Sequence, residues 1–141
     1  MTTRRRIFHY LAAALGLVGA IAAGPAIAQS KTGAVAIPPI IEKFVAAVNR
    51  GDAAAFLAFF PESGVVDDWG RKFTGPAAIK GWSDKEFIGA KGTMTVKSAT
   101  QSGNEVDVRA GWKSSFYSGD SRFIFVVNGD KISEMRIVSD K

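Results

Sequence analysis

One segment, residues 42–79, constrains the fold of this 141-residue chain more than any other. It reads as a helix, a tight joint, a second helix, a turn, a short strand and the start of a third helix. The strand ends in the carboxylate pair Asp67–Asp68, and Gly75-Pro76 opens the last helix. This order of elements is typical of the start of a small, cone-shaped α+β domain.

The first two helices are predicted from capping residues and from apolar spacing. Pro38 and Pro39 suit the first turn of a helix, where a missing N–H costs nothing. Gly51 can adopt the positive φ that ends a helix, and Asp52 is a good N-cap for the next one, residues 53–60. Apolar residues recur at helical spacing in the first helix: Ile40, Ile41, Phe44, Val45 and Val48.

The C-terminal half reads as an antiparallel meander. Its four predicted strands cover residues 93–99, 105–115, 121–127 and 131–139. Asn128-Gly129 is a strong hairpin pattern between the last two strands. The sequence therefore predicts an α+β fold, with about three N-terminal helices packed on a curved antiparallel sheet. Its apolar concave face leaves a pocket at the open end of the cone.

On these features, residues 42–79 resemble the SnoaL-like, or nuclear transport factor 2-like, superfamily. The resemblance implies that residues 38–141 form one such domain. It implies no single activity, because the superfamily includes enzymes, ligand binders and assembly modules. It also implies a homodimer, because this fold often dimerises through the exposed face of its sheet.

Residues 1–28 are predicted to be an export signal peptide. The basic start Arg4-Arg5-Arg6 precedes an apolar run, Leu11 to Ala23, and an A-x-A cleavage site that ends at Ala28. The pattern fits a twin-arginine signal and an ordinary secretory signal about equally. Because the apolar run is short and broken by glycines, we expect membrane contact only during export.

The mature protein is expected to be periplasmic or secreted and to begin at Gln29, with a flexible lead over residues 29–37. Its 113 residues carry a net charge of +2 in place of the +5 of the full chain, because three arginines leave with the signal peptide. The remaining charges are scattered, with no basic run beyond Arg71-Lys72. Nucleic-acid binding needs a concentrated basic patch and is therefore disfavoured.

The mature chain has no cysteine, and its lone histidine, His9, leaves with the signal peptide. This composition excludes disulfides, Ser-His-Asp and Cys-His catalysis, and zinc sites built from His and Cys. We expect no metal and no resident cofactor. Proton transfer would fall to Asp, Glu, Lys or Tyr.

Asp67 and Asp68 are the candidate catalytic residues. Neighbours in a strand point to opposite faces, so one of them can enter the pocket while the other meets solvent. A carboxylate in an apolar pocket has a raised pKa and becomes a usable general base. The alternative is a structural role, in which the two carboxylates cap backbone N–H groups or pair with Arg71 or Lys72. The residue types alone favour this structural role.

Residues 43–69 are similar, without gaps, to the opening of bacterial ketosteroid isomerases, for which an Asp base and an oxyanion hole of Tyr and protonated Asp are the known example. The resemblance places the base at Asp68, with Asp67 as the alternative. It places the two oxyanion donors at Phe44 and near Phe123, which have no donor group. This difference argues against steroid isomerisation.

The pocket is predicted to hold a small apolar or ring-containing molecule, and this is the preferred hypothesis for function. One alternative is an isomerase, dehydratase or hydrolase that uses Asp68 as its lone base, and another is a homodimeric assembly module. The predicted pocket residues are aromatic or apolar: Phe44, Trp69, Trp82, Trp112, Phe123 and Met135.

Overall fold

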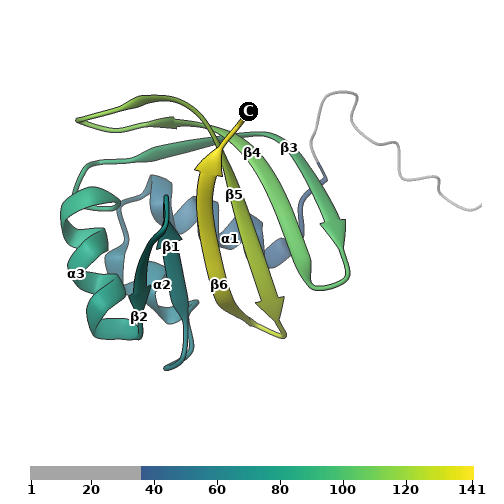
Figure 1. Cartoon of the computed structure of the whole chain (residues 1–141), viewed down its shortest axis with the longest axis horizontal. Helices are drawn as coiled ribbons and strands as arrows, with labels where there is room; N and C mark the ends of the chain where they lie inside the picture. The colour runs from purple at the N-terminus through teal and green to yellow at the C-terminus, as the bar shows by residue number, and fades with distance from the viewer. Residues whose placement is uncertain (1–35) are drawn as a thin grey trace, which may run out of the picture. The chain divides into compact units, whose positions relative to one another are not determined.

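The computed structural model describes residues 36–141. The predicted signal peptide, residues 1–28, and the first part of the predicted lead lie outside the described residues. Three helices and six strands form in the described part (Figure 1). In chain order they are α1 (Pro39–Asn49), α2 (Ala53–Ala58), β1 (Val65–Asp68), β2 (Arg71–Thr74), α3 (Pro76–Glu86), β3 (Thr93–Ser102), β4 (Glu105–Lys113), β5 (Ser118–Asn128) and β6 (Lys131–Ser139).

The strands form a single curved and unclosed sheet in the order β2-β1-β6-β5-β4-β3. Register shifts between Val96 and Ser98 in β3 and between Val126 and Val127 in β5 mark local irregularities, which bend a sheet. In Figure 1, α1 and α2 lie behind the sheet and α3 lies beside β2. The predicted α+β class is confirmed. Among residues 36–141, no helix is long and apolar enough to cross a membrane.

One detail of the predicted architecture is wrong. β1 pairs with β6 in parallel, so the sheet is mixed rather than purely antiparallel. The connection between β1 and β6 contains β2, α3 and three more strands, and after it β6 runs beside β1 in the same direction. The third helix, α3, follows the short strand β1 as the predicted order has it, with β2 between them.

The sequence also missed β2, which pairs with β1 through a two-residue turn at Trp69-Gly70. Both turn residues have positive φ, 56° at Trp69 and 89° at Gly70, as the tight hairpin turns require. The usual pattern for such a turn is Asn-Gly or Asp-Gly, which this chain lacks here. β2 is a short edge strand with mostly exposed side chains, so it has little apolar alternation to reveal it.

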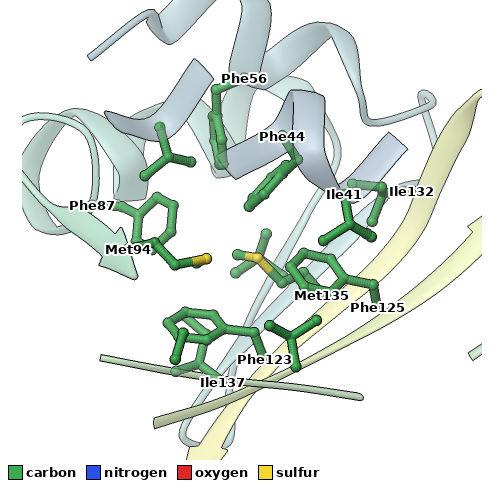
Figure 2. Close-up of a cluster of buried hydrophobic side chains, with 14 of the residues drawn as sticks. Ile41, Phe44, Phe56, Phe87, Met94, Phe123, Phe125, Ile132, Met135 and Ile137 are labelled. Atoms are coloured by element: carbon green, nitrogen blue, oxygen red, sulfur yellow. The ribbon is translucent and has the colours of Figure 1, made fainter. Parts of the chain in front are cut away.

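The core lies between the helices and the concave face of the sheet (Figure 2). Phe44 of α1 is fully buried, and its ring lies 5.5 Å from that of Phe56 and 5.1 Å from that of Phe125. Asn49 joins the end of α1 to β3, because its side chain donates to the Met94 carbonyl at 2.9 Å and accepts from the Met94 N–H at 2.7 Å. These contacts fix the helices on one face of the sheet.

The opposite face of the sheet carries charged pairs. Arg122 pairs with Asp107, and Arg136 pairs with Glu105 at 2.9 Å. The homodimer expected through this face stays a prediction.

Candidate functional site

A cavity of about 230 Å³ opens between the C-terminal part of α3, the β1–β2 turn and the end of the β4–β5 hairpin. It is the candidate functional site, because it combines aromatic walls with a buried carboxylate. The residues that line it are Asp68, Trp69, Trp82, Glu86, Phe87, Trp112, Ser114, Phe116, Tyr117, Ser121, Phe123 and Ile137.

Stacked aromatic rings build one wall of the cavity. The Phe87 ring lies 4.9 Å from that of Trp82 and 4.5 Å from that of Trp112, both in near-parallel stacks. The Trp112 ring packs so closely on Gly92 that a Cβ there would lie 2.0 Å from a Trp112 carbon. The Trp112 ring is therefore closely packed against both Phe87 and Gly92.

Asp68 lies at the end of β1 and is nine-tenths buried. Its Oδ2 accepts a hydrogen bond from Trp82 Nε1 at 3.0 Å and another from the guanidinium of Arg71. The Trp82 bond ties α3 to the sheet. Within the described part of the chain, Asp68 Oδ1 accepts no hydrogen bond, so one oxygen of this cavity-lining carboxylate is left for other partners.

Arg71 joins Asp68 to a second carboxylate, Glu86, at the end of α3. Its two terminal nitrogens donate to Glu86 Oε1 at 3.1 Å and Oε2 at 2.6 Å. The hydrogen bond from Arg71 lowers the pKa of Glu86, and the same bond raises the pKa of Arg71. The guanidinium also lies 5.7 Å from the centroid of the Phe73 ring, which helps to hold it in place.

Asp67 points to the other side of β1 and has a structural role. Its Oδ1 accepts from the backbone N–H of Gly70 at 2.7 Å and so closes the β1–β2 turn. Of the two candidate carboxylates, only Asp68 lines the cavity. The two structural roles proposed for the pair are both present, since Asp67 caps a backbone N–H and Asp68 pairs with Arg71.

The cavity mouth carries exposed aromatic side chains. Trp69, Phe116 and Tyr117 are 59%, 76% and 51% exposed, and they are the exposed large hydrophobic residues of the described chain. All three line the cavity. Trp69 also holds a positive φ of 56°, which is uncommon for a residue with a side chain and marks local strain.

Four of the six predicted pocket residues line the cavity, and the other two do not. Trp69, Trp82, Trp112 and Phe123 line the cavity with Asp68. The placement of Phe44 and Met135 on the pocket wall is corrected, because both are fully buried in the core and neither lines the cavity. Their positions face the α1–sheet interface, where packing leaves no space.

Sequence reasoning named Arg71 and Lys72 as possible partners of the carboxylate pair but missed Glu86. The register of the β1–β2 hairpin sets Arg71 opposite Asp68 and Lys72 opposite Asp67, which decides between the two expected partners. Glu86 lies on α3, and no local pattern connects it to the hairpin.

Comparison with known proteins agrees with this fold. The family model of the SnoaL-like domain matches residues 41–135, which is more than half of the chain. The chain belongs to this family. No curated protein matches it. Within residues 36–141, no group of three or more His, Cys, Asp or Glu side chains is placed to hold a metal ion.

Solved structures share the fold at low sequence identity. A candidate polyketide cyclase from Sinorhizobium meliloti is similar over 72% of this chain and 94% of that one, with 23% identity and a TM-score of 0.66. The epoxide hydrolase/cyclase-like enzyme SalBIII, which acts in pyran ring formation in salinomycin, is similar over 70% and 86%, with 20% identity and a TM-score of 0.65. A protein from Catenulispora acidiphila with a ketosteroid isomerase-like fold, in complex with trimethylamine, is similar over 72% and 85%, with 20% identity and a TM-score of 0.61.

The Arg71–Glu86 pair predicts a pH dependence of stability. Because Arg71 lowers the pKa of folded Glu86 below its ordinary value of 4.5, the pair stabilises the fold above that pH, and this contribution is lost as the pH falls through the pKa of the folded state. Glu86→Gln should therefore lower the free energy of unfolding by up to about 1 kcal/mol at pH 7, since the pair is exposed. The difference from the wild type should vanish in acid, as measured by urea unfolding across pH.

The exposed residue Glu62, which takes part in no ion pair within the described chain, provides the control. Glu62→Gln should leave the pH profile of stability unchanged. A Glu86→Gln protein whose deficit persists below pH 3 would show that the lost stability is not due to the charge of Glu86.

Proposed function

We propose that this domain binds a small, ring-containing apolar molecule in the cavity beside α3. The observation that carries the proposal is the position of the exposed aromatics, since Trp69, Phe116 and Tyr117 all stand at one cavity mouth. Exposed apolar side chains that gather in one place mark binding sites, whereas isolated ones need no explanation. Behind them the buried rings of Trp82, Trp112 and Phe123 continue the apolar wall inward.

The size of the cavity supports a ligand of about one ring. An engineered apolar cavity of about 150 Å³ is known to hold benzene. The volume here, about 230 Å³, leaves room for a ring with a small substituent. Relatives with this fold include a candidate polyketide cyclase, an enzyme of pyran ring formation and a protein in complex with trimethylamine, and this range is consistent with a small organic ligand.

All three tryptophans of the chain line the cavity, so intrinsic fluorescence reports directly on occupancy. We expect at least one of three single-ring probes, tert-butylbenzene, phenyltrimethylammonium or benzenesulfonate, to change this fluorescence in a saturable way. Trp69→Ala should weaken that binding by about 5- to 30-fold, because it removes a ring that covers the ligand.

The Trp69→Ala variant suits this test because Trp69 is exposed, and alanine meets the same positive φ. Ile124→Ala, on the opposite face of the sheet, is the matched control and should bind as the wild type does. Saturable binding by none of the three probes would refute the proposed function.

We also propose that the domain acts outside the cytoplasm after export. The support is the sequence pattern of residues 1–28, a basic start followed by an apolar run and an A-x-A site. When the full-length gene is expressed in a bacterium, mass spectrometry of the periplasmic fraction should find a protein that begins at Gln29. A protein that stays in the cytoplasm with its N-terminus intact would contradict export.

A second candidate function is supported by the Asp68–Arg71–Glu86 arrangement. In this function the Asp68 carboxylate takes a proton from an attacking water, the carbon–oxygen bond of the ring breaks, and the released oxygen takes a proton from solvent at the open cavity. This chemistry suits hydrolysis of a small ring such as an epoxide. A relative with this fold, SalBIII, is an epoxide hydrolase/cyclase-like enzyme.

Styrene oxide, which carries a single aromatic ring, is a suitable trial substrate for this second function. If the domain hydrolyses it, Asp68→Asn should reduce kcat by 10²-fold or more, on the order expected for loss of a general base. The control Asp67→Asn should retain the rate, because Asp67 faces away from the cavity. Equal turnover by Asp68→Asn and wild type would exclude Asp68 as the base.

A further inference from the structure

We propose that the molecule held in this cavity is a cation, with an ammonium group attached to its ring-sized apolar body. This inference rests on the proposed function, the binding of a ring-containing molecule, and names the chemical class of that ligand. It follows from the charges of the cavity wall, from the charge balance of its neighbours and from the kind of apolar surface that the wall presents.

The charges of the wall are all negative. Asp68 and Glu86 line the cavity, and no lysine or arginine is among the lining residues of the described chain. Arg71 contacts both carboxylates but does not line the cavity. A ligand inside the cavity therefore meets two carboxylates and no cationic side chain.

Arg71 balances only one of the two negative charges. The group Asp68, Glu86 and Arg71 carries a net charge of −1, since both carboxylates share a single guanidinium. Asp68 Oδ1 is the oxygen that accepts no hydrogen bond within the described part of the chain. A ligand with one positive charge would neutralise the group and place its charge near this free oxygen.

The apolar part of the wall is made of aromatic rings rather than of aliphatic side chains. Ile137 is the one aliphatic residue among those that line the cavity, and the apolar remainder is Trp69, Trp82, Phe87, Trp112, Phe116, Tyr117 and Phe123. The negative face of an aromatic ring attracts a cation, and tryptophan does so most strongly. Cages of aromatic rings are the usual sites that recognise quaternary ammonium groups.

Neutral and anionic ligands fit the cavity less well. A neutral ring would remove water from the free oxygen of Asp68 without replacing its hydrogen bonds, which is unfavourable for a buried charge. An anion would meet the repulsion of two carboxylates without contact to a cation in the wall. Of the three classes, only the cation gains from both the charges and the rings.

Three probes of similar shape separate these classes: phenyltrimethylammonium, its neutral isostere tert-butylbenzene and the anion benzenesulfonate. We expect tryptophan fluorescence titrations to give at least about tenfold tighter binding for the ammonium than for the neutral isostere, and the weakest binding for the anion. Added salt should weaken binding of the ammonium only.

Asp68→Asn should reduce the ammonium's affinity by about tenfold or more and leave tert-butylbenzene's affinity unchanged or higher. The neutral probe thus also shows whether this variant keeps a folded cavity, and Asp67→Asn is the matched control that should bind all probes as the wild type does. If the variant loses both probes, Glu86→Gln, at the exposed end of α3, replaces it in the same comparison.

The outcomes distinguish the two proposals. Binding of tert-butylbenzene as tight as, or tighter than, that of phenyltrimethylammonium would overturn the cation inference and leave the ring-binding function intact. If benzenesulfonate bound most tightly of the three probes, the cation inference would likewise be overturned and the ring-binding function would stand. Failure of all three probes to bind would refute the proposed function and the cation inference together.

Discussion

The packing of Phe87 is the contact on which both the core and the cavity depend. This fully buried ring follows α3 and lies 5.5 Å from Phe56 in the core, while its other neighbours are the cavity residues Trp82 and Trp112. One side chain therefore belongs to the interior and to the cavity wall. Because interiors are close-packed, the wall cannot rearrange without disturbing the core. The cavity is for this reason a preformed feature of the fold rather than a gap between mobile parts.

The charged groups of this apolar wall come from three consecutive elements of the chain, β1, β2 and α3. The β1–β2 hairpin supplies Asp68 and Arg71, and α3 supplies Trp82 and Glu86. The Trp82 hydrogen bond and the Arg71 ion pairs hold the buried carboxylate in place and connect hairpin to helix. The same contacts leave an excess negative charge beside aromatic rings. The contacts that stabilise this region therefore also set the charge of the cavity wall.

Much of the architecture could be predicted from local patterns, but only part of the site could. Asp52 caps α2, with its side chain accepting from the Ala55 N–H, as its position after Gly51 predicts. By contrast, Trp69-Gly70 lacks the composition of a hairpin turn, and β2 was therefore missed. The likeness to ketosteroid isomerases led to Phe44 as a pocket residue, although it packs in the core. Arg71 was a candidate because it follows Asp68 closely in the sequence, whereas Trp82 and Glu86 reach the site through the packing of α3, which no local pattern shows.

The amino-acid sequence alone established the class of the fold, the lack of cysteine chemistry and the candidate pair Asp67–Asp68. These follow from residue types, helix caps and apolar periodicity, which act over a few neighbouring residues. Only the tertiary structure decided that Asp68 faces the cavity and that Arg71 and Glu86 join it. It also decided that β1 runs parallel to β6. Burial and charge pairing depend on which elements pack against one another, and that is set by the packing of the whole domain.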